Sequence, residues 1–80
     1  MTEEFVLIQT QRQCLAEALD ALGSIEDIVE VDAVTGPYDV VVRVRGNGRM
    51  GEGVVESIRR APGVLRALAC PVVGRIALQR

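Results

Sequence analysis

Residues 34–42 read Val-Thr-Gly-Pro-Tyr-Asp-Val-Val-Val, and this stretch decides the fold because it joins a tight turn directly to a buried strand. Pro37 fixes its own φ angle and biases the residue before it away from helical angles. That residue is Gly36, which adopts backbone angles that other residues avoid and leaves room beside it. The turn is therefore predicted to be rigid and open, and it is where we expect a small ligand to be held.

The residues after the turn alternate between two faces of the predicted strand. Tyr38, Val40, Val42 and Val44 fall on one face, and Asp39, Val41, Arg43 and Arg45 fall on the other. Because Asp39 comes first on its face, its carboxylate is expected at the mouth of the strand, pointing away from the Tyr38 face.

The rest of the chain forms two similar halves. The predicted strands cover residues 5–10, 28–34, 38–45 and 64–72, and the predicted helices cover residues 12–22 and about 50–60. Each helix has one apolar face at helical spacing: Leu15, Ala18, Leu19 and Leu22 in the first, and Met50, Val54, Ile58 and Ala61 in the second. Gly23 is expected to end the first helix, and Pro62-Gly63 the second. The order β-α-β-β-α-β predicts an α+β, ferredoxin-like fold, in which a four-stranded antiparallel sheet carries both helices on one face.

The pattern of the strands also predicts which side chains face the helices. In the second strand Val29, Val31 and Ala33 are expected to face inward, and Glu30 and Asp32 to face solvent. The opposite sheet face is expected to hold Val41 and several of Phe5, Val6, Leu7, Ile8, Leu65, Ala67 and Ala69. Such an apolar face is not expected to stay wet, so two copies should pack sheet to sheet as a dimer. Arg43 and Arg45 would then lie near its rim or pair with acids of the partner.

Length and composition bound the class of protein. A chain of 80 residues buries only about 60 to 65% of its unfolded surface, so partner surfaces are expected to complete its core. Thirteen valines and only two aromatic residues indicate a β-rich globular chain. No apolar run approaches the roughly 18 residues that span a bilayer, and the first residues carry acid where a secretory signal carries base. We therefore expect a soluble, cytoplasmic protein with no membrane partner.

The two cysteines do not predict a metal site. Cys14 and Cys70 are far apart without metal-ligand spacing, and the sequence has no histidine. Both are expected to be reduced core residues, because free cysteine is commonly buried. No metal and no cofactor are predicted.

Charge is distributed unevenly along the chain. Residues 1–40 hold nine acids and one base, whereas residues 41–80 hold two acids and eight bases. One interpretation is that these are solvated faces of elements that intermingle in the fold. The other is self-complementarity, in which an acidic surface of one subunit meets a basic surface of another. Every basic residue is Arg, which suits bidentate contacts at an interface.

Several stretches together resemble one known family. They are residues 5–10, residues 34–44, the helix that follows, Pro62-Gly63-Val64 and Cys70-Pro71-Val72-Val73. In these the chain is similar to the effector-binding domain of the Lrp/AsnC regulators, also called the RAM domain, and the glycine, tyrosine and aspartate of the hairpin are the most specific element. The resemblance implies sheets paired into a dimeric α/β barrel and further assembly, commonly to an octamer. It also implies amino-acid effectors in clefts between dimers, lined by the hairpin turn and the fourth strand.

The resemblance assigns roles to five positions. Gly36 would supply the open turn beside the effector, Tyr38 a wall of the dimer or cleft, and Asp39 a carboxylate that pairs with an ammonium group. Family members often carry alternating threonines in the fourth strand, where this chain has Ala67 and Ala69. Each lost hydrogen bond costs on the order of 1 kcal/mol, so the effector is different, weakly bound or absent. The alternative is that the glycine, tyrosine and aspartate only build the hairpin.

Full-length members of the family begin with a helix-turn-helix domain, whereas the first residues here lead directly into a strand. Residues 1–80 are thus expected to form a single effector-binding domain without a DNA-binding domain, and no direct contact with nucleic acid is predicted. Two functions follow. One is an amino-acid-sensing, oligomerising module in transcriptional regulation, and the other is an assembly module that joins full-length regulators and has lost its effector.

Three other classes fit the sequence less well. Residues 46–51 match G-x-G-x-x-G between a strand and a helix, but the acid and the parallel sheet of a dinucleotide-binding fold are missing. Small dimeric α/β-barrel enzymes share the architecture, yet there is no histidine or tryptophan and no cluster of acid, base and nucleophile around Asp39. Single-stranded nucleic acid would need more stacking platforms than Phe5 and Tyr38.

Overall fold

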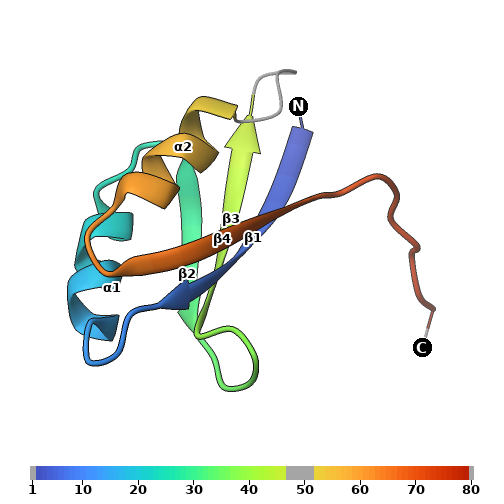
Figure 1. The fold of residues 1–80 in the computed structure, drawn as a ribbon. Coiled ribbons are helices and arrows are strands. Elements are labelled where there is room, and N and C mark those ends of the chain that lie inside the picture. Colours follow the sequence, from blue (N-terminus) through green and yellow to red (C-terminus); the bar gives the residue numbers. More distant parts are fainter. Residues whose placement is uncertain (1, 47–51, 80) are drawn as a thin grey trace.

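The computed structural model describes residues 2–46 and 52–79 and has the predicted element order. The elements are β1 (Thr2–Thr10), α1 (Leu15–Gly23), β2 (Ile28–Ala33), β3 (Val40–Gly46), α2 (Glu52–Arg60) and β4 (Val64–Pro71). The four strands form one antiparallel sheet in the order β2-β3-β1-β4, and both helices cover the same face of it (Figure 1). The ferredoxin-like fold is therefore confirmed, with β1 and β3 in the centre and β2 and β4 at the edges.

The hydrophobic core lies between the helices and the two central strands. Val6 and Ile8 of β1 pair with Val42 and Val40 of β3, and all four side chains are fully buried. Ala18 and Leu22 of α1 and Ile58 of α2 complete this cluster. Val44 is also buried, so the predicted alternation along β3 is confirmed. Burying an aliphatic side chain of this size stabilises a fold by about 1.5–3 kcal/mol, so this face supplies most of the stability.

The helices bury most of the predicted faces, with local differences at their ends. Leu15 is the first residue of α1 and is 39% exposed, whereas α2 also buries Val55, which was not predicted. Met50 and the glycine motif at 46–51 lie wholly or largely outside the described residues. α1 ends at Gly23 as expected, but the cap is made by Ser24, whose hydroxyl donates to the carbonyl of Ala21 at 2.8 Å.

Pro62-Gly63 follows the end of α2, as predicted. Gly63 has a φ of +84°, and a Cβ there would lie only 2.8 Å from the carbonyl oxygen of Cys14. A glycine is required at this position both for the backbone angle and for the close approach of the turn to the start of α1.

Two β-bulges correct the prediction of which residues face inward. The register of β2 on β3 shifts between Ile28 and Glu30, which leaves Val29 as an extra residue, 41% exposed instead of buried. Ala33 pairs with the buried Val40 and so lies on the predicted inward side, but it ends β2 and is exposed there. A second shift lies where β1 pairs with β4. Thr10 pairs with Val64 and Gln9 with Arg66, so Leu65 lies between two paired residues of β4.

The outer face of the sheet, opposite the helices, is apolar in its middle. Of the residues expected there, Phe5, Leu7 and Val41 are confirmed, because each is offset by one residue from the buried positions of its strand. Their neighbours on β4 are Leu68 and Cys70. Val6, Ile8, Ala67 and Ala69 instead belong to the helix-covered face, since the two alanines pair with Ile8 and Val6.

Residues 72–79 follow β4 as an extended segment, called the C-terminal arm below. Figure 1 shows the arm leading away from the sheet and helices. At its base, the amide of Val72 donates to the carbonyl of Glu3 at 3.0 Å. Among the described elements, no helix is long and apolar enough to cross a membrane.

Candidate functional site

The hairpin between β2 and β3 has the open turn that the sequence predicts, and its rigidity stays a prediction. The amide of Val34 donates to the carbonyl of Asp39 at 2.8 Å, which closes the loop. Gly36 has a φ of +133°, an angle that side chains disfavour, and a Cβ at this position would meet nothing within 4 Å. The turn residues 35–37 are exposed, while Tyr38 is half-buried. The turn therefore offers free space beside its backbone.

Asp39 fastens this hairpin to the end of the central strand. Its Oδ2 accepts hydrogen bonds from the backbone amide of Thr10 at 2.9 Å and from the Thr10 hydroxyl at 3.1 Å. Its own amide donates to the carbonyl of Ile8 at 2.9 Å. Among the described residues, both contacts of the carboxylate use Oδ2, which leaves Oδ1 for another donor at a half-buried position. Thr10 is the residue of this site that the sequence did not single out.

Ala67 and Ala69 lie on the helix-covered face of the sheet. Ala67 pairs with Ile8 and Ala69 with Val6, and both methyl groups pack against the core on the side of the helices. Arg59 of α2 donates to the carbonyl of Ala67 at 3.4 Å on the same side. The structure thus brings Asp39 and Thr10 together, but it places the two alanines beneath the helix layer. A ligand-binding role for all five residues stays a prediction.

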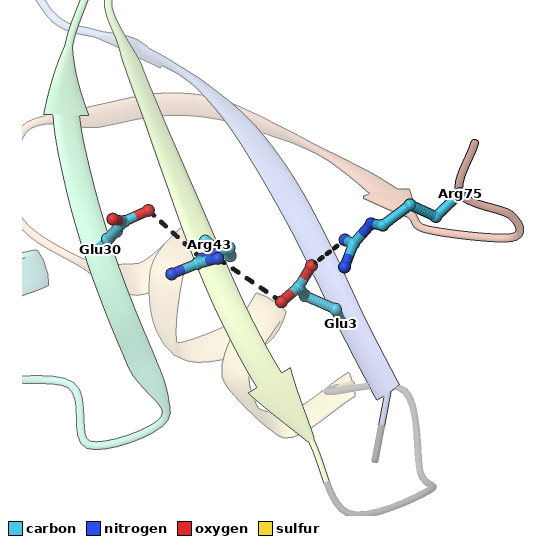
Figure 2. A network of polar contacts seen from close by, with 4 residues as sticks. All are labelled: Glu3, Glu30, Arg43 and Arg75. Carbon is cyan, nitrogen blue, oxygen red and sulfur yellow. Dashed lines mark hydrogen bonds and ion pairs between the residues drawn. The ribbon is translucent and has the colours of Figure 1, made fainter. Parts of the chain in front are cut away.

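A row of four alternating charges crosses the outer face and its rim. Figure 2 shows Arg43 between two carboxylates, with its Nε 3.3 Å from Glu30 Oε1 and its Nη1 3.6 Å from Glu3 Oε2. Glu3 also accepts a hydrogen bond from Arg75 of the C-terminal arm. The row therefore joins β2, β3, β1 and the arm, and Arg43 is paired with acids of its own chain.

Glu3 and Glu4 are adjacent in sequence but experience opposite environments. The hydrogen bond from Arg75, helped by the charge of Arg43, lowers the pKa of Glu3 against a smaller opposing effect of burial. Glu4 points to the helix-covered face, is 5% exposed and has a buried Oε1 that finds no hydrogen-bond partner within residues 2–46 and 52–79. Burial raises the pKa of Glu4.

The cysteines and acids do not assemble into a metal centre. Cys14 and Cys70 are both free thiols and half-buried, so the expected core position is only partly met. Within residues 2–46 and 52–79, no three histidine, cysteine, aspartate or glutamate side chains gather as metal ligands would.

The open glycine turn and the anchored carboxylate of Asp39 thus lie together at one end of a ferredoxin-like sheet. The chain belongs to the Lrp/AsnC ligand binding domain family, whose model matches residues 3–77. No curated protein matches the sequence.

Several solved structures share this fold. A protein from Thermus thermophilus is 28% identical, with a TM-score of 0.83 over 98% of this chain and 100% of its own. AsnC from E. coli is 17% identical, with a TM-score of 0.80 over 99% of this chain and 55% of its own. A feast or famine regulatory protein from M. tuberculosis, complexed with L-methionine, is 23% identical with a TM-score of 0.77, covering 100% of this chain and 55% of its own. The last two show the fold alone, and this chain spans about half their length.

Proposed function

We propose that this protein senses an amino acid and oligomerises as a cytoplasmic module of transcriptional regulation, without contacting DNA directly and without catalysing a reaction. Membership of the Lrp/AsnC ligand binding domain family supports the sensing role. A relative of the same fold is complexed with L-methionine, which is consistent with an amino acid as the effector.

The observation that carries the proposal is the carboxylate of Asp39 beside the open turn. Thr10 holds it through Oδ2, so the charge is fixed in place while Oδ1 is available to an ammonium group. Gly36 leaves its surroundings empty to 4 Å, so the turn backbone is accessible to the carboxylate of the same ligand. The two charged groups of an amino acid match these two features.

The proposed assembly is a dimer formed through the outer faces of two sheets, with further association to a ring such as an octamer. The half-buried Phe5, Leu7 and Val41 and the 49% exposed Leu68 support it, because a contiguous apolar face is stabilised when a partner covers it. A second copy presents the same apolar centre and the same row of paired charges, as an isologous interface requires.

A second candidate is an assembly module that joins full-length family regulators and binds no effector. It is favoured by the position of Ala67 and Ala69, which offer no hydroxyl and pack toward the helices. This candidate shares the dimer with the first and differs only in the role of Asp39.

The test measures the thermal midpoint of the protein, at fixed protein concentration, with each amino acid at millimolar levels. A ligand at 100 times its dissociation constant adds about 2.7 kcal/mol, a shift of many degrees for a domain of this size. Asp39→Asn keeps an oxygen to accept the Thr10 amide but removes the negative charge, so it should abolish the shift and leave the oligomer intact. Asp32→Asn, at an exposed acid of β2, is the matched control and should respond like the wild type.

If no amino acid raises the thermal midpoint, the sensing proposal is wrong and the assembly module is the remaining candidate. The second candidate is then tested by mixing the protein with a full-length Lrp/AsnC regulator and recording native mass spectra. Mixed oligomers would support it, and separate homo-oligomers would rule it out.

A further inference from the structure

The C-terminal arm carries exposed apolar side chains. Val73, Ile76 and Leu78 are 98%, 84% and 70% exposed. Ile76 and Leu78 are two residues apart, so in an extended segment they point to the same side. Apolar groups on a segment that leads away from its own domain (Figure 1) indicate contact with another molecule.

The base of the arm is held in one direction. Val72 donates its amide to the carbonyl of Glu3, and Arg75 donates to the Glu3 side chain. Glu3 is itself paired with Arg43, so the base of the arm is tied to the central strands (Figure 2). These contacts hold the arm at residues 72 and 75, and its outer part leads away from its own sheet (Figure 1).

The two edges of the sheet carry opposite charge. Residues 24–34, which contain β2, hold four acids and no base, namely Glu26, Asp27, Glu30 and Asp32. Residues 64–80, which contain β4 and the arm, hold three arginines and no acid. All four acids, and Arg66 and Arg75 on the other edge, are exposed, and of these Glu30 and Arg75 are also paired within their own chain. Opposite charges on two surfaces select their mutual orientation more than their affinity.

This charge pattern selects one of two arrangements of a sheet-to-sheet dimer. A two-fold axis that lies between the two sheets and runs perpendicular to the strands would place β2 over β2 and β4 over β4. The acidic edge of one copy would then meet the acidic edge of the other. An axis parallel to the strands places the β4 edge of each copy beside the β2 edge of the other, because β2 and β4 are the two ends of the strand order. The arm that leaves β4 then runs beside β2 of the second copy. In the single chain, Val29 of β2 and Val34, the first residue after β2, are each 41% exposed.

We propose that the C-terminal arm of each copy packs along the β2 edge of a second copy, with Ile76 and Leu78 against the apolar residues of that edge. This inference rests on the proposed sheet-to-sheet dimer. It adds to that dimer a contact made by the C-terminal arm of each partner. The arm thus gives each protomer a second contact outside the paired sheets.

The first test places a photo-crosslinking residue in the arm of the full chain, as Ile76→p-benzoylphenylalanine, and mixes protein labelled with ¹⁴N and with ¹⁵N. Mass spectrometry then separates crosslinks between copies from those within one copy. Crosslinks between copies that reach residues 28–34 are expected. The matched control is Ala77→p-benzoylphenylalanine, which points to the other side of the arm and should crosslink less. Crosslinks confined to one copy, or reaching residues 64–71 of the other, would overturn the proposal.

The second test measures the dimer dissociation constant by analytical ultracentrifugation. The double variant Ile76→Asp/Leu78→Asp should raise it about tenfold or more, whereas Ala77→Asp should change it by less than about threefold. If the double variant leaves the constant unchanged while Val41→Asp on the outer face dissociates the dimer, the arm inference fails and sheet pairing stands. A wild-type protein that stays monomeric would refute both.

Discussion

The two faces of the sheet are built from the same strands but differ in chemistry. On the helix-covered face Val6, Ile8, Val40 and Val42 are fully buried. On the outer face, one residue away along each strand, Leu68 is 49% exposed and Arg43 lies between two carboxylates. Because strand side chains alternate, core side chains and side chains accessible to a partner are separated by a single step in sequence. Substitutions at neighbouring residues are therefore expected to change different measured properties of the protein.

The largest difference is expected between Ile8 and Leu7. Ile8→Ala leaves a cavity in the core and should lower the free energy of unfolding by about 2–5 kcal/mol, measured by urea denaturation. Leu7→Ala removes a half-buried side chain of the outer face, so its loss of stability should be small at low protein concentration and, if the proposed dimer forms, should grow as the concentration rises. Equal losses for both variants at every concentration would show that the two faces do not differ in this way.

The next comparison is between the turn at Gly63, where an added Cβ would meet Cys14, and the hairpin turn at Gly36, where the space is open. Gly63→Ala combines a positive φ with a Cβ 2.8 Å from the carbonyl oxygen of Cys14, so we expect a loss of roughly 1–3 kcal/mol in thermal or urea unfolding. Gly36→Ala also has a positive φ, but the space beside it is empty and the exposed hairpin is able to relax. A larger loss at Gly36 than at Gly63 would contradict the importance of the close approach to α1.

A smaller effect, with the opposite sign, is expected at Glu4. Burial raises its pKa above the ordinary 4.5, so Glu4 favours the folded state while it is protonated, and wild-type stability falls as pH rises through the raised value. Glu4→Gln lacks this charge, so at pH 7 it should be more stable than the wild type by up to about 1 kcal/mol, with little difference near pH 3. Urea midpoints from pH 3 to 8 provide the check, and a variant that is less stable throughout would argue against a buried, unpartnered carboxylate.

The smallest effect belongs to Glu3, on the outer face. Arg75 lowers its pKa, so its contribution is present above the ordinary pKa and is lost as pH falls through the lowered value. Glu3→Gln should therefore be slightly less stable than the wild type at pH 7 and similar to it at low pH, the reverse of Glu4→Gln. The difference should shrink in 1 M salt, because the pair is exposed. A difference that does not change with salt would assign Glu3 a role other than charge pairing.

Much of the fold could be predicted because local patterns determine it. The alternation after Asp39 placed Val40, Val42 and Val44 in the core without knowledge of any partner strand. Residues 5–8 are apolar at every position, so their pattern did not indicate which residues face the helices, and only the register with β3 decides this. The exposure of Val29 has a similar cause, because the bulge depends on pairing with another strand.

The candidate site was predictable only in part, for the same physical reason. Gly36 and Asp39 were located from the turn itself, since the backbone angles of a turn are set by a few adjacent residues. The contact of Asp39 with Thr10 joins residues 29 positions apart, and the pairing of Glu3 with Arg75 joins residues 72 apart. Such contacts follow from the strand order and not from any local pattern, so the sequence indicated the acid without its partner.

The strand order also has a consequence for how the molecule folds. β1 precedes all other elements in this sequence, yet it lies between β3 and β4, and β4 follows every other element. Pairing of this kind has to close long loops before its contacts form, which slows folding, whereas the hairpin of β2 and β3 closes locally. We expect the hairpin to form early, β1 to join it later, and β4 to pair last. The strand β1 thus comes before the other elements along this sequence, and we expect its pairing in the sheet to be completed last.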